Sequence, residues 1–275
     1  MTTNEISISV LLPTRGRTTA LETSLITLIE HASCPDRVQI LLGFDQDDTA
    51  SQDYFVETIK PKLDKLNTNF TAMIFEPMGY IRLNEYVNKL ALHASGEWLM
   101  FWNDDAIMES SGWDDKIRNW NGKFKVLRMP THNFHPYAIF PIVPKLWYDL
   151  FGYLSDHQIS DAWISQIGYM VDIMQDIDVK VTHDRHDLTG NNGDETFHRR
   201  PMLEGNPRNP RDFNHASWRA RRMADARKIH QYLINTGENT GWFDAVLQGK
   251  KDPWEKMMSP ACDPNKQLAK TDARY

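Results

Sequence analysis

The first half of the chain alternates between short, continuous runs of apolar side chains and longer segments in which apolar side chains recur every three or four positions. Runs of the first kind are typical of buried strands, and spacing of the second kind is typical of amphipathic helices. Strands are expected over residues 6–12, 38–44, 70–75 and 98–102. Helices are expected between them, over residues 18–31, 52–66 and 82–94. This alternation of strands and helices predicts an α/β fold, with a mostly parallel sheet flanked by helices on both faces.

The periodicity weakens after Asn103. Short helices are expected over residues 112–120 and 160–174, and strands over residues 126–129, 138–143 and 179–182. Residues 188–214 are rich in Gly, Asn, Pro and Arg, a composition typical of an extended loop. A helix over residues 216–235 would begin a helical C-terminal extension. We therefore expect an α/β domain over residues 1–190, followed by a flexible loop and a helical appendage over residues 191–275.

The composition is that of a soluble globular protein, with 41% hydrophobic and 25% charged residues in a chain of 275. The N-terminal residues lack the basic start and apolar stretch of a signal peptide, and no apolar segment reaches the roughly 18 residues of a membrane span. The two cysteines, Cys34 and Cys262, are too far apart in sequence to indicate a disulfide framework or a zinc site. A cytoplasmic location is the simplest expectation.

The net charge of −6 argues against a general nucleic-acid-binding protein, but this charge is unevenly distributed. The segment from His198 to Lys228 holds nine Arg and Lys residues against three acidic ones. Such a basic segment on an acidic body suits the phosphates of a nucleotide donor or of an anionic acceptor. The alternative is a solvated helix face, which is the simpler interpretation of residues 219–228.

Three polar clusters follow three of the predicted strands, at Pro13–Arg17, Asp45–Asp48 and Asn103–Asp105. The carboxyl ends of parallel strands meet at one edge of a sheet, where such folds bind their ligands. Two adjacent carboxylates there suit a hard divalent cation, which prefers oxygen ligands. Asp and Asn are also common in helix caps and turns, so the triplet alone leaves both interpretations open.

From Ile8 to about His186 the sequence resembles a GT-A glycosyltransferase of the family 2 type. The landmarks are a first strand ending in Pro-Thr-Arg, a second strand ending in acidic residues, the segment Met-Gly-Tyr-Ile-Arg-Leu-Asn at 78–84, and the segment from Ala-Ser-Gly-Glu to Asn-Asp-Asp at 94–105. The resemblance implies a GT-A fold and an inverting glycosyltransferase. It also implies a nucleotide-sugar donor, with a UDP sugar the first expectation, held with Mn²⁺ or Mg²⁺.

The resemblance also implies which residues hold the cation. Asp105 occupies the last position of the metal motif and would bind the cation that bridges the diphosphate. Asn103 stands where the family usually has the first Asp, and its amide carries no charge, so metal binding would depend on Asp105 and on any contribution from Asp104. A late histidine commonly adds a ligand in these folds. His183, after the expected strand over residues 179–182, is the candidate, with His186 as the alternative.

The nucleotide would lie against the ends of the first two strands and the segment over residues 78–84. Arg15 or Arg17 would meet phosphate charge, and Asp45 is the best match to the acid that recognises uracil, with Asp47 or Asp48 as alternatives. Asn84 either lies near the diphosphate or is structural. The residues implied in donor binding are therefore Pro13, Thr14, Arg15, Asp45, Arg82, Asn103 and Asp104.

Inverting transfer needs a base that removes the proton of the acceptor hydroxyl. The family places an acid at the start of a helix some distance after the metal motif, which points to Asp161, with Asp156 as the second choice. An ordinary acid in the first turn of a helix is the alternative. The loop over residues 188–214, with Arg199 and Arg200, resembles the lid that closes over the donor in such enzymes.

The acceptor is not identified by the sequence and could be a glycan, a small molecule or an anionic polymer. Three aromatic residues near the motifs, Trp102, Trp113 and Trp163, either stack on a sugar ring or belong to the core. Two other functions remain open. One is a nucleotidyltransferase, disfavoured because the loop after the first strand has a single glycine, and the other is a catalytically silent nucleotide- or sugar-binding module.

Overall fold

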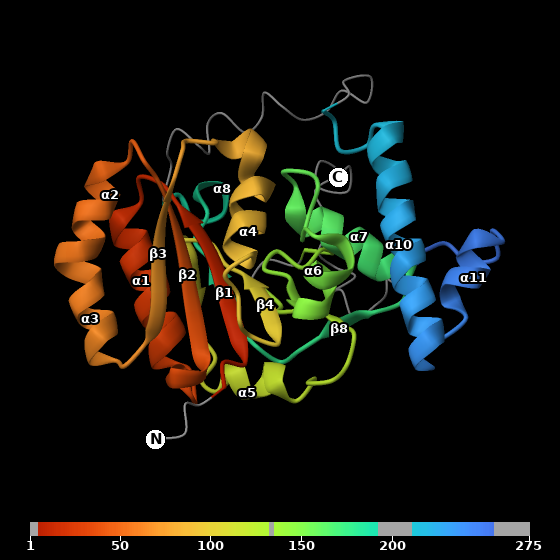
Figure 1. Ribbon diagram of the computed structural model, residues 1–275, viewed down its shortest axis with the longest axis horizontal. Helices are drawn as coiled ribbons and strands as arrows, with labels where there is room; N and C mark the ends of the chain where they lie inside the picture. Colours follow the sequence, from red (N-terminus) through yellow and green to blue (C-terminus); the bar gives the residue numbers. More distant parts are fainter. Residues whose placement is uncertain (1–4, 132–134, 192–210, 256–275) are drawn as a thin grey trace.

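The computed structural model describes residues 5–131, 135–191 and 211–255 and centres on a seven-stranded sheet (Figure 1). Its strands are β1 (Ile8–Thr14), β2 (Val38–Asp45), β3 (Asn69–Phe75), β4 (Trp98–Phe101), β6 (Val126–Arg128), β7 (Ile142–Pro144) and β8 (Met174–Asp176), in the order β3-β2-β1-β4-β7-β6-β8. The first four strands are parallel, and only β7 runs antiparallel to its neighbours β4 and β6. The predicted α/β fold with a mostly parallel sheet is confirmed.

Alternate side chains of the central strands point to opposite faces of the sheet, and each face is covered by helices. Val10 and Ile40 pack in the apolar cluster that includes α1, whereas Leu11 and Leu41 pack in the cluster that includes α4, α6, α7 and α10. Both faces are therefore buried, which explains why the strands are continuous apolar runs. The helices are α1 (Thr18–Glu30), α2 (Thr49–Tyr54), α3 (Lys60–Lys65), α4 (Leu83–Ala91), α5 (Trp113–Arg118), α6 (Lys145–Phe151), α7 (Ser160–Met170), α8 (His186–Thr189), α10 (Ala216–Thr236) and α11 (Trp242–Leu247).

Several expected elements differ from the observed ones in the second half of the chain. The last expected strand, β9 (Val181–His183), does not join the main sheet but pairs with β5 (Ala106–Met108) in a separate two-stranded antiparallel sheet. The expected helix over residues 160–174 ends at Met170, because Asp172 adopts a left-handed backbone conformation and the chain then forms β8. Sequence periodicity did not reveal these pairings, since they depend on contacts between distant segments.

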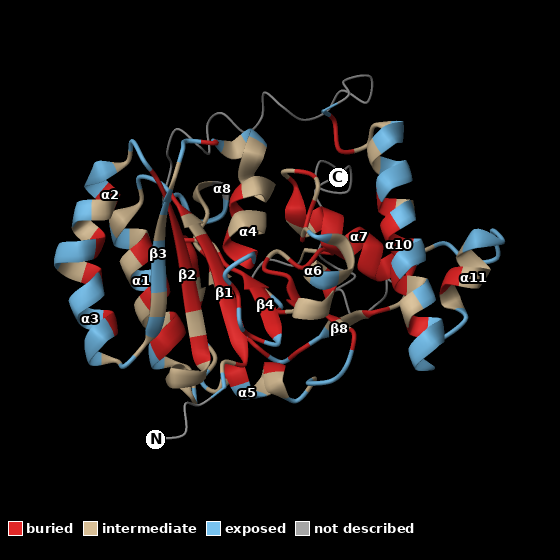
Figure 2. Ribbon diagram, viewed as in Figure 1, coloured by how far each residue is buried: buried red, intermediate tan, exposed pale blue. Residues whose placement is uncertain are grey.

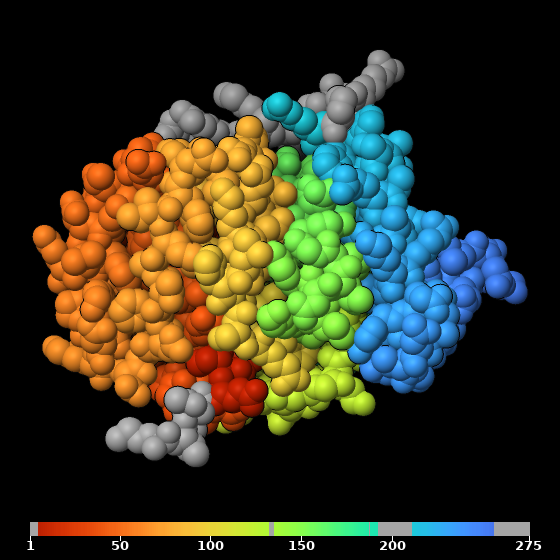
Figure 3. All heavy atoms as spheres, in the orientation of Figure 1, coloured from red at the N-terminus to blue at the C-terminus, as the bar shows by residue number. Residues whose placement is uncertain are grey.

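Helix α10 of the expected C-terminal extension packs on the α/β body rather than projecting from it. Ala226, Ile229 and Leu233 lie in the same apolar cluster as residues of α7 and of the sheet. Figure 2 shows a buried inner edge and an exposed outer edge along α10, and Figure 3 shows α10 beside the residues of α6. The division of the chain near residue 190 stays a prediction. Within the described ranges, no helix has both the length and the apolar character needed to cross a bilayer.

Gly96, which precedes β4, allows a close approach of two backbone segments. A Cβ atom at this position would lie 2.6 Å from the backbone nitrogen of Ser9 and 2.7 Å from the carbonyl carbon of Ile8. We expect Gly96→Ala to lower the free energy of unfolding by about 1–3 kcal/mol, because buried backbone atoms must move apart. Urea denaturation of this variant beside Ser95→Ala, an exposed neighbour, measures the effect, and equal midpoints for the two variants would contradict it.

Candidate active site

The three polar clusters predicted from the sequence meet at one edge of the sheet. Thr14 ends β1, Asp45 ends β2, and Asn103 follows β4, with β1 lying between the other two strands. The chain builds β2 and β3 on one side of β1 and then returns to place β4 on the other side, which creates the switch point where α/β folds bind ligands. A cavity of about 220 Å³ opens there. Its lining includes Pro13, Thr14, Arg15, Arg17, Asp45, Asn103, Asp104, Asp105, Asp161 and His183.

The acidic motif is buried and held by residues of the loop after β1. Asp104 and Asp105 are only 6% and 5% exposed. The Thr14 hydroxyl donates to Asp104 Oδ2 over 2.8 Å, and Arg17 Nη1 donates to Asp104 Oδ1 and Asp105 Oδ2 over 3.0 and 3.1 Å. Burial raises the pKa of Asp104, against the opposing effect of Arg17. Burial acts in the same direction on Asp105, but His183 and Arg17 outweigh it and lower the pKa of Asp105.

The two expected metal ligands, Asp105 and His183, lie together. Pairing of β5 with β9 sets Ala106 opposite His183, and His183 Nε2 lies 3.3 Å from Asp105 Oδ1. Oδ1 is buried, and His183 is its one polar side-chain neighbour among the contacts of the described residues. Neighbouring ligand atoms around an octahedral cation with bonds of about 2.1 Å are about 3 Å apart, so this pair fits a small divalent cation. His186 lies in α8 and does not line the cavity, and its Nδ1 is 3.2 Å from the carbonyl oxygen of Asn191.

Asp45 is the acid of the second cluster that faces the cavity. Its Oδ2 accepts a hydrogen bond of 2.7 Å from Arg15, whereas its Oδ1 is buried without a hydrogen-bond partner. Burial raises the pKa of Asp45, and Arg15 opposes that rise. Asp47 is exposed and also binds Arg15, and Asp48 caps α2 by accepting from the backbone of Ser51. The alternatives to Asp45 therefore have roles within the loop.

Two residues expected near the diphosphate have other partners. The Arg82 guanidinium donates two hydrogen bonds of 2.7 Å to Glu85 and does not line the cavity, so its role in donor binding stays a prediction. Asn84 donates over 3.4 Å to the carbonyl oxygen of Ser155, which favours the structural interpretation. Gly79 and Tyr80, from the same segment, line the cavity instead.

Asp161, the expected base, lies in the first turn of α7 and lines the cavity. Gln158 and Ser160, its neighbours in sequence, line the cavity too. This segment is distant from the acidic motif in sequence, yet both line the same cavity. Asp156, the second choice, does not line the cavity. Its carboxylate pairs with Arg221 of α10 over 2.5 Å. The structure thus places Asp161, not Asp156, where a substrate can reach it.

Some lining residues were not indicated by the sequence. Arg185 follows His183 by two positions, and Phe101 lies inside the landmark over residues 94–105 without having been singled out. The rest come from segments in which no motif was recognised: Tyr86, Ile139, Gln158 and Ile159. Trp102, Trp113 and Trp163 are fully buried and belong to the core, so they are not platforms for a sugar ring. Trp102 Nε1 donates to Ser24 and Trp113 Nε1 to the carbonyl oxygen of Leu28. A fully buried indole cannot stack on a ligand in this conformation.

The basic segment is only partly described. Arg199, Arg200 and Arg208, and with them most of the expected lid, lie outside the described residues. On α10, Arg222 is 3% exposed and lies 3.9 Å from the centre of the Phe213 ring, so it belongs to the core. The exposed cations of this helix are Arg219, Arg221, Arg227 and Lys228.

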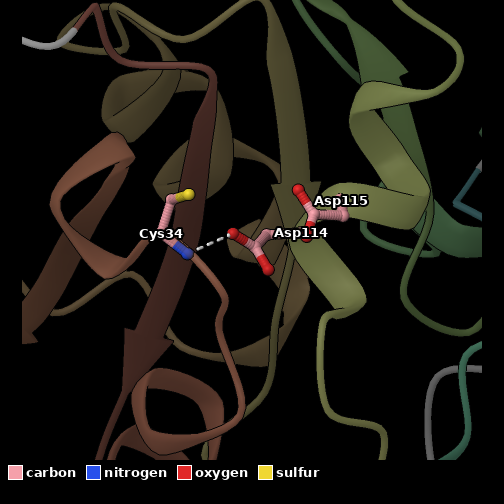
Figure 4. Close-up of side chains that lie close together, drawn as sticks. All are labelled: Cys34, Asp114 and Asp115. Carbon is pink, nitrogen blue, oxygen red and sulfur yellow. Dashed lines mark hydrogen bonds between the residues drawn. The ribbon is translucent and has the colours of Figure 1, made fainter.

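A second group of acidic and thiol side chains lies at the opposite end of α1, around Cys34, Asp114 and Asp115 (Figure 4). Asp114 is fully buried and accepts hydrogen bonds of 2.7 and 2.9 Å from the backbone nitrogens of Ser33 and Cys34. It also pairs with Arg118 over 2.9 Å. These bonds tie the turn after α1 to the start of α5, which accounts for the buried carboxylate without a ligand.

Comparison with solved structures shows the same fold in glycosyltransferases. The mannosyltransferase PcManGT from Pyrobaculum calidifontis, in complex with GDP-Man and Mn²⁺, aligns with a TM-score of 0.53 and 12% identity, over 88% of this chain and 79% of that one. TarS of S. aureus aligns with a TM-score of 0.51 and 13% identity, over 66% of this chain. Residues 1–349 of TarS in complex with UDP-GlcNAc align with a TM-score of 0.50 and 13% identity, over 70% of this chain.

These likenesses establish that the chain has the GT-A glycosyltransferase fold. The chain spans 37% of TarS and 64% of its 1–349 fragment, so it corresponds to part of that protein only. No protein-family model matches the sequence, and a search of curated proteins finds no match.

Proposed function

We propose that the protein is a glycosyltransferase that moves a sugar from a UDP-sugar donor to an acceptor hydroxyl, with a divalent cation and with inversion at the anomeric carbon. The observation that carries this proposal is the convergence of Asp45, Asp105, His183 and Asp161 on one cavity at the switch point of the sheet. These residues come from four separate segments of the chain. Asp45 would recognise the base, Asp105 and His183 would together hold the cation, and Asp161 would accept the proton.

The hydrogen bonding of Asp45 favours uracil as the base of the donor nucleotide. Its Oδ1 is a buried acceptor without a donor, and its Oδ2 is already bound to Arg15. Uracil offers one imide N–H, which one free oxygen satisfies. Guanine offers two adjacent N–H groups, which a carboxylate accepts best with both oxygens, and one of these is engaged here. We therefore favour UDP over GDP, although PcManGT was solved with GDP-Man.

Asp105 and His183 would hold the cation, with Asp104 beside them. Bound there, Mn²⁺ or Mg²⁺ offsets the negative charge that develops on the departing nucleoside diphosphate. The burial of Asp105 Oδ1 and its 3.3 Å separation from His183 Nε2 support this assignment. Asn103 lines the cavity as a neutral neighbour, so the motif has two carboxylates rather than three.

Asp161 would act as the base. Asp161 lines the cavity from the first turn of α7, and Asp104 and Asp105 of the acidic motif line the same cavity. A base that accepts the proton of the acceptor hydroxyl, while that oxygen attacks the anomeric carbon from the side opposite the leaving group, gives inversion. Because Asp161 is only partly buried, an acceptor can reach it from solvent.

A donor panel tests the proposal directly. With Mn²⁺ present, we expect the protein to bind and slowly hydrolyse a UDP sugar in preference to a GDP sugar. Asp45→Ala should weaken UDP binding by about 10- to 100-fold, the value of a hydrogen bond to a charged group. Asp47→Ala is the matched control, because Asp47 belongs to the same loop and is exposed. Calorimetry with UDP measures both variants.

Three outcomes would favour other functions. Release of pyrophosphate from a nucleoside triphosphate would replace the proposal with a nucleotidyltransferase. Binding of nucleotide sugars without turnover of any donor would favour a silent binding module. Equal losses of UDP affinity in Asp45→Ala and Asp47→Ala would remove Asp45 from base recognition.

A further inference from the structure

The side chain of Arg17 lies between the two carboxylates of the acidic motif. Its Nη1 is 3.0 Å from Asp104 Oδ1 and 3.1 Å from Asp105 Oδ2, and the side chain is 15% exposed. The residue directly precedes α1, and its carbonyl oxygen accepts a hydrogen bond of 2.8 Å from the backbone nitrogen of Leu21. The start of the helix therefore anchors Arg17 where its guanidinium can bridge both acids.

This arrangement places a permanent cation on a carboxylate assigned to the divalent ion. Asp104, Asp105 and Arg17 together carry one net negative charge, and Asn103 adds none. A divalent ion on Asp105 would be close to the guanidinium, which is bound to the other oxygen of the same carboxylate. Repulsion between like charges at such distances in a buried site is strong. The guanidinium on Oδ2 therefore opposes, through charge repulsion, the binding of a divalent cation at Oδ1 of the same carboxylate.

We propose that Arg17 is the resident counter-cation of Asp104 and Asp105, and that it makes binding of the divalent cation depend on the diphosphate of the donor. This inference rests on the proposed function. Without nucleotide, Arg17 neutralises the motif and disfavours the divalent ion. Arg17 lines the same cavity as the donor-binding residues, so a bound diphosphate provides the guanidinium with another anionic partner. The repulsion that Arg17 exerts on a divalent cation at Asp105 Oδ1 then falls.

Such coupling is reciprocal, because a nucleotide that tightens cation binding must itself be bound more tightly when the cation is present. The site therefore binds the cation firmly only when the donor is also bound. A rigid site with three free carboxylates would instead bind the cation in advance. Arg17 is thus a positioning residue, which acts through the carboxylates.

Titration with Mn²⁺ followed by electron paramagnetic resonance tests this role without any turnover. We expect Arg17→Met to tighten nucleotide-free Mn²⁺ binding by about tenfold or more, because the competing charge is gone. UDP should then improve Mn²⁺ affinity by a correspondingly smaller factor than in the wild type. Arg17→Lys, which keeps the positive charge but replaces the guanidinium with a more strongly hydrated ammonium group, should be intermediate.

Arg15→Met is the matched control for the loss of one positive charge from the same loop. Arg15 contacts Asp45 and Asp47 but neither acid of the motif, so nucleotide-free Mn²⁺ affinity should change far less than in Arg17→Met. Arg17→Met should also melt at a lower temperature without metal, and Mn²⁺ should raise its melting temperature more than that of the wild type.

The possible failures are distinguishable. Unchanged or weaker Mn²⁺ binding in Arg17→Met and Arg17→Lys, with UDP-dependent Mn²⁺ binding intact in the wild type, would overturn the role of Arg17 alone. An equal gain in Mn²⁺ affinity in Arg15→Met would show that the loss of any positive charge from this loop has the same effect, and it would also overturn the role of Arg17. Absence of Mn²⁺ binding in the wild type, with and without UDP, would overturn the proposed metal dependence and this inference together.

Discussion

Asp161→Asn is expected to lower Mn²⁺-dependent hydrolysis of a UDP sugar by about 100- to 10,000-fold, the usual contribution of a general base. Water can replace the unknown acceptor in this assay, since its proton must also be removed as it attacks the anomeric carbon. The affinity for the UDP sugar should stay close to that of the wild type, because the assigned donor contacts lie on other segments, at the ends of β1, β2 and β4. A steady-state assay of released UDP, combined with calorimetry, separates these two effects.

Asp156→Asn is the control for this experiment. Asp156 precedes Asp161 by five positions, but its carboxylate pairs with Arg221 and does not line the cavity. We expect hydrolysis by Asp156→Asn to stay within about threefold of the wild type, since surface ion pairs contribute little. If Asp161→Asn retained comparable activity, Asp161 would be an ordinary acid in the first turn of a helix, where its charge favours the helix dipole.

Asp105→Ala is expected to weaken Mn²⁺-dependent binding of the UDP sugar by at least about 100-fold, because even partners outside the first coordination shell contribute about 10- to 100-fold. The protein should remain folded. Asp104 keeps its bonds to Thr14 and Arg17, and removal of one of two adjacent buried charges relieves repulsion. We expect the melting temperature without metal to change by no more than about 5 °C. Stabilisation by Mn²⁺ should be lost.

The second acidic group provides the control. Asp115→Ala removes an exposed carboxylate from the group with Cys34 and Asp114, and we expect Mn²⁺ binding and UDP-sugar binding to be unchanged. If Asp115→Ala abolished Mn²⁺ binding and Asp105→Ala did not, the cation would bind at the far end of α1 and the proposed site would be wrong. Isothermal titration of both variants with Mn²⁺ and UDP distinguishes these outcomes.

The sequence was most informative where chemistry and local structure share the same short segment. The apolar runs over β1, β2 and β4 end directly in Thr14, Asp45 and Asn103, so the order of strands was enough to predict one common edge. The cavity brings residues of all three clusters together, among them Thr14, Asp45 and Asp105, and Asp161 and His183 line it as well. Their catalytic and binding roles stay predictions.

The sequence was least informative where a role depends on pairing between distant segments. Arg17 was only an alternative to Arg15 for phosphate contact, and nothing in the local pattern indicated that it bridges two acids some ninety positions away. Arg82 belongs to the landmark segment over residues 78–84, yet its guanidinium donates to Glu85, which lies three positions later in the chain. Trp163 is buried by packing against α10, which no local pattern indicates.

Periodicity and strand ends are local properties of the chain, so they were enough to predict the α/β class, the edge of the sheet that carries the polar clusters, and the candidate acids. Which of these side chains are buried, which oxygen atoms lack donors and which cation lies beside them became known from the folded arrangement. Burial and charge pairing arise from segments far apart in sequence. For Asp105, the adjacent β5–β9 pair brings His183 to one oxygen, and the start of α1 brings Arg17 to the other.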